Sequence, residues 1–283
     1  MPRAHREPLG QHAVALNIKA PTSTPRPPLR FEAADGGRIL LRQNTRTVLL
    51  AKVEQANQGV HLTRLEGYTS PLPPIRTAHN SNWPHQYARW LEDSPNTPLH
   101  PSRWHLYTRT TFPPYVWHAP DLVRTWPTAH LDWSAHGWHG IVPLRPLSPP
   151  DAPRVKAYRK RAREGTLPPV LLWWVTAFDG WLLLDGHDRA VAALEEGGTP
   201  PCVVLARVPD EEDWRRDAAE MTESHSEGNQ GDLTFQPRPD THLAHALAAL
   251  PYQAAPTRSW PLPGGAAAWD QTAARAMFQF PGD

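Results

Sequence analysis

The segment WLLLDGHDRAVAALEEGG, residues 181–198, decides the fold class, because an apolar run becomes an alanine-rich run within five residues. The apolar residues 181–184 are typical of a buried strand. Residues 189–196 have the composition of a helix, and Gly197 and Gly198 end it. The five residues between them, Asp-Gly-His-Asp-Arg at 185–189, are therefore expected to form a turn from a strand into a helix.

The flanking residues complete a mixed α+β unit. LSPPDAPRVKAYRKRAREG, residues 147–165, predicts a helix that Asp151 caps, with Pro153 in its first turn and Gly165 at its end. PPVLLWWVT at 168–176 predicts a buried strand, FDG a turn, and WLLL a second strand paired back on the first. PPCVVLARV at 200–208 predicts a third strand.

The turn has the features of an anion site. A strand-to-helix turn directs the first free N–H groups of the helix outward at its positive end, and Gly186 allows a ligand to approach closely. Arg189 offers a guanidinium suited to phosphate, while Asp185, His187 and Asp188 can add hydrogen bonds, a proton shuttle or metal coordination. The structural alternative is a helix capped by Asp185, with Arg189 in a surface salt bridge.

The order of these elements resembles the ParB/sulfiredoxin-like superfamily over residues 141–208, about a quarter of the chain. Its members have a helix, a Gly-x-x-Pro-Pro approach to a strand (here residues 165–169), a strand that leads into a Gly-x-x-Arg turn (here 186–189), a helix and an outer strand. Partition proteins of this superfamily carry Gly-Glu-Arg-Arg and bind CTP, and sulfiredoxins carry Gly-Cys-His-Arg. The free-serine kinases carry Asp-Gly-His-His-Arg, which is closest to the present motif; Asp188 replaces one histidine.

The resemblance implies a site and a ligand. Gly186, His187 and Arg189 would bind the phosphate of a nucleotide (ATP, ADP or CTP) that carries Mg²⁺. Asp185, His187 and Asp188 would serve phosphoryl transfer to a small-molecule acceptor, or nucleotide hydrolysis. Arg154 and Lys156, early on the preceding helix, are placed to face the turn. No set of protein metal ligands is predicted.

Other residues contribute less to this interpretation. Sulfiredoxin chemistry is disfavoured because His187 takes the place of the nucleophile, and Cys202 is expected to be a buried apolar residue. A second carboxylate for catalysis would have to come from Glu195 or Glu196, which are expected to face solvent. Asp151 and Asp179 have no better support.

Two other classes of function remain open. A nucleotide-gated, partition-like DNA-binding protein would need a helix-turn-helix after residue 208, whereas residues 209–240 are acidic and then rich in Gly, Ser and Asn. The net charge of +1, from 29 basic and 28 acidic residues, also speaks against DNA as a partner. The other class is an interaction module that keeps the fold without chemistry.

The remainder of the chain is less informative. Residues 1–30 are expected to form a flexible Pro-rich lead, and 31–140 a β-containing region with strands near 38–43, 47–55 and 60–68. Seven of the 13 tryptophans lie within 83–140, where packing is the favoured role. There, His130, His136 and His139 are interpreted as surface or packing residues, because no carboxylate or cysteine nearby completes a metal site.

Residues 209–283 are expected to form a linker, with short helices at 242–250 and 265–278. A single cysteine excludes an intrachain disulfide, and no apolar run approaches the roughly 18 residues of a membrane span. The expectation is a cytoplasmic protein with no membrane partner.

Overall fold

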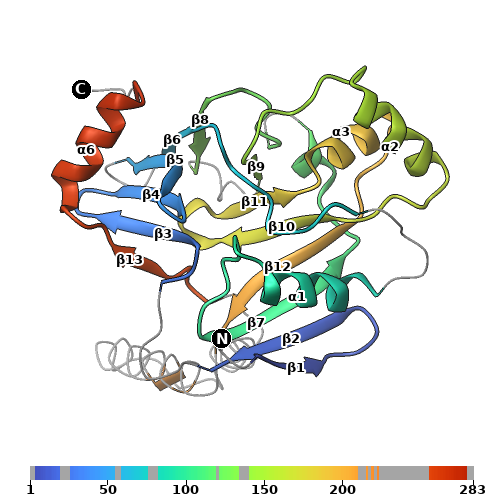
Figure 1. Ribbon diagram of the computed structural model, residues 1–283, viewed down its shortest axis with the longest axis horizontal. Helices are drawn as coiled ribbons and strands as arrows, with labels where there is room; N and C mark the ends of the chain where they lie inside the picture. The colour runs from blue at the N-terminus through green and yellow to red at the C-terminus, as the bar shows by residue number, and fades with distance from the viewer. Residues whose placement is uncertain are drawn as a thin grey trace, which may run out of the picture.

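The computed structural model describes residues 4–19, 26–54, 59–75, 82–118, 121–133, 140–209, 215, 218–219, 222 and 255–278. Within them the chain forms two β-sheets and four α-helices, which confirms the α+β class (Figure 1). None of the helices described there has both the length and the apolar character needed to cross a membrane.

The larger sheet contains the strands predicted around the turn. Its order is β1 (Ala4–Pro8), β2 (Ala13–Ile18), β7 (Ser102–Arg109), β12 (Cys202–Val208), β10 (Val170–Val175), β11 (Gly180–Asp185) and β9 (Ile141–Pro143). β10 and β11 are antiparallel neighbours joined by the 3-10 turn η3 (Thr176–Phe178), as the FDG turn predicts. β10 is parallel to β12, and α3 (His187–Glu195) makes the crossover from β11 to β12.

The smaller sheet confirms the strands predicted between residues 38 and 68. Its order is β13 (Ser259–Pro261), β3 (Leu29–Ala34), β4 (Arg38–Gln43), β5 (Arg46–Val53), β6 (Gly59–Arg64) and β8 (Thr128–Asp132). The strands from β3 to β8 are antiparallel, and β13 joins the edge parallel to β3.

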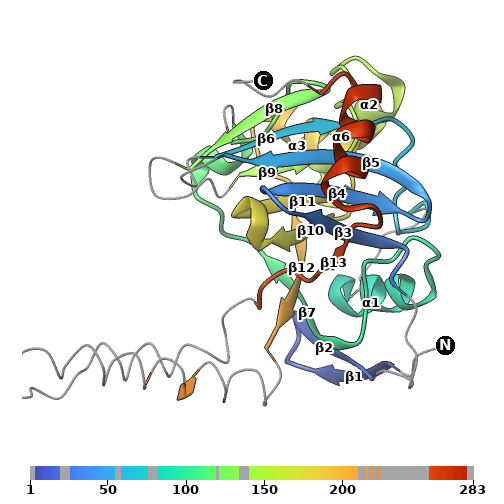
Figure 2. The same cartoon turned by 90° about the vertical axis from the view of Figure 1, so that its left-hand side faces the viewer.

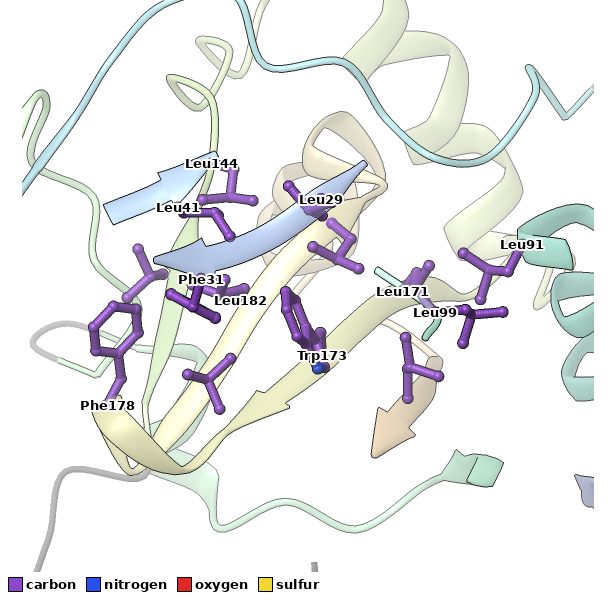
Figure 3. Close-up of a cluster of buried hydrophobic side chains, with 14 of the residues drawn as sticks. Leu29, Phe31, Leu41, Leu91, Leu99, Leu144, Leu171, Trp173, Phe178 and Leu182 are labelled. Carbon is purple, nitrogen blue, oxygen red and sulfur yellow. The ribbon is translucent and has the colours of Figure 1, made fainter. Parts of the chain in front are cut away.

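The main core lies between the two sheets. Phe31 and Leu41 of the smaller sheet meet Trp173 and Leu182 of the larger one (Figure 3). Each strand alternates its side chains between its two faces, so apolar residues at every second position supply this shared core. The first helix, α1 (Trp83–Asp93), adds Tyr87 and other apolar side chains to it.

Helices cover the outer faces of both sheets. The last helix, α6 (Gly265–Arg275), crosses the smaller sheet and buries Trp269 against it (Figure 2). On the far side of the larger sheet, α3 packs beside α2 (Pro153–Arg163) and the 3-10 helix η2 (Pro114–Trp117). The order helix, strand, strand, turn, helix, strand is therefore present over residues 153–208.

The expectation of a flexible lead at residues 1–30 is wrong for residues 4–18, which the structure describes. Residues 4–18 form β1 and β2, and β2 pairs with β7 along its whole length. Val14 and Leu16 are fully buried, because alternate apolar side chains of β2 extend the shared core. The proline-dense part begins only after these strands.

One further expectation needs correction. Asp151 does not cap α2: Ala152 occupies the N-cap position without a side-chain hydrogen bond, although Pro153 and Gly165 stand at the ends as predicted. The larger sheet includes strands from both sides of residue 141, because β7 from the Trp-rich region pairs with β12.

The Trp-rich region contributes to packing, as predicted for Trp104 and Trp117, which are both buried. The helix predicted at 265–278 is α6. The helix predicted at 242–250, most of the linker, and His136 and His139 lie outside the described residues.

Candidate anion-binding site

The turn from β11 into α3 depends on a glycine. Gly186 occupies the N-cap position of α3 with φ 94° and ψ 25°, in the left-handed region that disfavours residues with a Cβ atom. A Cβ atom at this position would also lie 2.8 Å from Nη2 of Arg189 and from Cγ1 of Val170. A side chain at residue 186 would therefore strain the backbone and crowd Arg189 and Val170.

Arg189 points into the protein, and its side chain is 5% exposed. Its Nη2 atom lies 2.5 Å from Oδ2 of Asp185 and donates a hydrogen bond of 3.0 Å to the carbonyl oxygen of Pro169. The hydroxyl of Tyr87 donates to the same carbonyl. Burial alone lowers the pKa of Arg189, but the Asp185 carboxylate raises it above its ordinary value, so the guanidinium stays charged.

His187 is buried and neutral. Its Nε2 atom accepts a hydrogen bond of 3.2 Å from the backbone N–H of Arg145, and Nη2 of Arg145 lies 3.5 Å from Nδ1 of the ring. Burial, and then the positive charges of Arg145, Arg189 and Arg64, lower the pKa of His187 well below its ordinary value. The Nε2 lone pair is thus already engaged, and the ring would have to move before it could accept a proton from a substrate.

The two aspartates of the motif bind partners outside it. Asp185 accepts a hydrogen bond of 2.6 Å from the hydroxyl of Ser70. Asp188 accepts one of 2.7 Å from Ser148, and its other oxygen lies 3.3 Å from Nε of Arg154. Arg154 therefore faces the turn, as expected, although its side chain is 72% exposed. Lys156 is exposed two residues further along the same helix, on a different face from Arg154, so it does not face the turn as expected.

Two segments close over the turn that sequence reasoning did not place there. Residues 68–72, after β6, bring Ser70 to Asp185, and the hydroxyl of Tyr68 donates to the carbonyl oxygen of Leu184. Residues 145–148, after β9, bring Arg145 and Ser148. No local sequence pattern links Tyr68 or Ser70 to the turn, because residues 184 and 185, which they contact, lie more than 100 residues further along the chain.

Positive charge exceeds negative charge around this helix start. Four guanidinium groups are present against the carboxylates of Asp185 and Asp188; they belong to Arg64, Arg145, Arg154 and Arg189. Arg64 lies inside the protein, where its guanidinium donates to backbone carbonyls and burial lowers its pKa to about 10.

Several donors at this helix start have no protein acceptor. No side chain among the described residues caps the first N–H groups of α3. The buried Nε atoms of Arg145 and Arg189 also have no hydrogen-bond partner within the described part of the chain. An uncapped helix N-terminus surrounded by guanidinium groups attracts an anion.

The remaining candidates lie away from this site. Glu196 pairs with Arg159 and Arg163 at the other end of α3, and Asp179 occupies the turn at the far end of β11. Asp151 precedes α2, and Cys202 lies in the core with its thiol pKa raised by burial. None of these residues supplies a further carboxylate or a nucleophile to the turn.

The structure also corrects the alternative interpretation of the turn, in which Asp185 caps the helix and Arg189 forms a surface salt bridge. Asp185 does not cap α3, because Gly186 holds that position, and the Arg189–Asp185 pair is buried rather than at the surface. The turn is thus held in place from within the protein.

Comparison with family models, with curated proteins and with solved structures finds no match to this chain.

Proposed function

We propose that this protein binds the phosphate group of a nucleotide at the N-terminus of α3. The observation that carries the proposal is the excess of guanidinium groups around an uncapped helix start, in a turn whose left-handed backbone favours glycine. The resemblance of residues 141–208 to the ParB/sulfiredoxin-like superfamily makes a nucleoside phosphate the expected ligand.

The residues around the turn divide into those that reach a ligand and those that hold the turn. Arg154 is exposed, so its guanidinium can leave Asp188 and contact a phosphate. Arg145 lies beside the helix start, and its Nε atom has no hydrogen-bond partner within the described residues. Arg189 and His187 are buried, and in this arrangement they hold the turn and add positive charge or hydrogen bonds from within.

The carboxylates of the turn do not fit a magnesium ion in this arrangement. Asp185 contacts Ser70 through one oxygen and Arg189 through the other, and both oxygens of Asp188 are engaged in the same way. The proposal is therefore one of binding. Phosphoryl transfer or hydrolysis by Asp185, His187 and Asp188 stays a prediction that requires these contacts to open.

One observation favours a second candidate, an interaction module without chemistry. The buried ion pair between Asp185 and Arg189, closed by Ser70, satisfies the motif residues within the protein itself. In that case the same residues stabilise the start of α3, and no phosphate is needed to explain them. DNA binding receives no comparable support.

Isothermal titration with ATP, ADP and CTP, each with and without Mg²⁺, tests the proposal. We expect one nucleotide to bind in the micromolar range. Arg145→Ala and Arg154→Ala should each weaken binding by about tenfold or more, since a charge-assisted hydrogen bond contributes about 1.5–3 kcal/mol. Lys156→Ala removes one positive charge from an exposed position of the same helix and is the matched control.

The outcomes separate the two candidates. Loss of affinity in Arg145→Ala and Arg154→Ala, with Lys156→Ala unchanged, supports a phosphate site at the turn. Absence of binding by the wild type refutes it for nucleotides and leaves the interaction module. Release of inorganic phosphate from the bound nucleotide, measured in the same samples, would show whether chemistry follows binding.

A further inference from the structure

A second cluster of chemically active side chains lies on the smaller sheet. Glu54 directly follows β5, His61 lies in β6 and His130 lies in β8, and these three strands are adjacent (Figure 2). His61 and His130 are direct partners across the β6–β8 pair. Val60 and Leu62 point into the shared core, so His61 between them points to the outer face of the sheet.

The ligand atoms of the cluster converge. Nε2 of His61 lies 2.5 Å from Oε1 of Glu54, and Nε2 of His130 lies 3.0 Å from the same oxygen. The two imidazole rings stack with their centroids 4.3 Å apart. One potential ligand atom from each residue lies within 4.8 Å of the other two.

Gly59 makes this convergence possible. The backbone N–H of Glu54 donates to the carbonyl oxygen of Gly59, so Gly59 lies between Glu54 on one side and β8 on the other. A Cβ atom at Gly59 would lie 2.6 Å from Nε2 of His130. The missing side chain therefore leaves the space through which the His130 ring reaches across β6 towards Glu54.

We propose that Glu54, His61 and His130 bind a divalent transition-metal ion, with Zn²⁺ as the expected ion. Two imidazole nitrogens and one carboxylate oxygen form a ligand set found at zinc sites that keep a fourth position open, and they suit zinc, nickel or copper better than magnesium or calcium. Ligand atoms on a tetrahedral ion lie about 3.3 Å apart when each bond is about 2.0–2.2 Å. The Nε2–Oε1 contacts of 2.5 Å and 3.0 Å would therefore widen by about 0.8 Å and 0.3 Å when the ion enters.

Exposure of the cluster leaves room for a fourth ligand. The side chains of His61, Glu54 and His130 are 16%, 24% and 40% exposed, so water can reach the ion from the His130 side. Three protein ligands with an open position allow the ion to bind water or a small anion. No carboxylate lies close to His130 in the sequence, so the local pattern does not indicate a metal site; the pairing of β5, β6 and β8 brings Glu54 to it.

Metal titration of the untagged, full-length chain tests this proposal. We expect one equivalent of Zn²⁺ to bind, and Co²⁺ in its place to give the visible absorption of an imidazole-bound ion. His61→Ala, His130→Ala and Glu54→Gln should each weaken binding by at least about tenfold, since even the loss of an outer partner of a metal ligand costs that much. His118→Ala, at an exposed histidine outside the cluster, is the matched control.

A pH series and a folding control make the result decisive. Because the ion competes with protons for the imidazole nitrogens, acidification should weaken binding. Far-UV circular dichroism of Glu54→Gln should match that of the wild type. Weak or absent Zn²⁺ binding by the wild type, or equal affinity in Glu54→Gln, His130→Ala and the control, overturns the proposal.

Discussion

At position 186 both the backbone conformation and the surrounding atoms favour glycine. A side chain there meets the left-handed φ of 94° and contacts of 2.8 Å with Arg189 and Val170. Gly197, at the other end of α3, has a φ of 75°, but a Cβ atom added there would have no neighbouring atom within 4 Å. A comparison of substitutions at the two glycines therefore separates the cost of a strained backbone from the cost of close side-chain contacts.

We predict that Gly186→Ala lowers the free energy of unfolding by about 2–4 kcal/mol, through backbone strain and overpacking together. Gly197→Ala should cost only the strain, about 1 kcal/mol. Urea unfolding of the two variants measures both values. Equal costs at the two positions would show that the close contacts at Gly186 are relieved by small movements and do not fix the turn.

The single residues of the motif were identifiable from sequence, but most of their contacts were not. Glycine before a helix and an arginine three residues later follow from the local pattern. Ser70 and Tyr68 follow β6 in the other sheet, so no local signal links them to Asp185 and Leu184. The structural alternative drawn from sequence therefore placed a salt bridge at the surface, where the structure has a buried one.

At the scale of elements, Arg189 fastens α3 to the segment that enters β10. Its guanidinium joins Asp185, at the end of β11, to the carbonyl of Pro169, just before β10. Removal of one charge from a buried pair leaves the other charge buried without a partner, which lowers the free energy of unfolding. Removal of both charges leaves no unpaired charge and avoids this loss.

We predict that Arg189→Met lowers the free energy of unfolding by about 3 kcal/mol, and that adding Asp185→Asn recovers part of the loss. Chemical denaturation of the single and double variants provides the comparison. A double variant that loses the sum of the two single losses would mean that the pair does not couple α3 to its surroundings.

The hairpin of β10 and β11, the turn and α3 were predictable because each has a clear local pattern: an apolar run, a glycine among polar residues and a closing Gly-Gly. The cap of α2 was not, because the choice between Asp151 and Ala152 depends on the exact residue at which the helix begins. Helix ends are set by one or two residues, and several polar residues compete for them.

At the scale of the whole molecule, the two sheets share one core, so residues far apart in sequence stabilise the same unit. β2 pairs with β7, and β7 pairs with β12. Strand order across such a sheet depends on pairing between distant segments, which periodicity within one segment does not encode. The sequence therefore predicted a flexible lead where the sheet continues.

We predict that deletion of residues 1–19 lowers the melting temperature by about 10 °C or more. The deletion removes the apolar side chains of β2 and exposes the edge of β7, and each buried side chain of this size contributes about 1.5–3 kcal/mol. Deletion of residues 1–3 alone is the control. An unchanged melting temperature after the longer deletion would contradict a structural role for these strands.

The most direct test of the proposed phosphate site is to follow the backbone amide resonances of the assigned protein as the tightest-binding nucleotide is added. A phosphate bound at the turn should give the largest chemical-shift changes at His187, Asp188 and Arg189, whose N–H groups lie at the start of α3, with smaller changes at Arg145. Lys156→Ala should leave this pattern unchanged, and Arg154→Ala should weaken it. Shifts confined to another surface, or no shifts at millimolar nucleotide, would rule out a phosphate site at the turn and leave the turn as a structural link between β11 and α3.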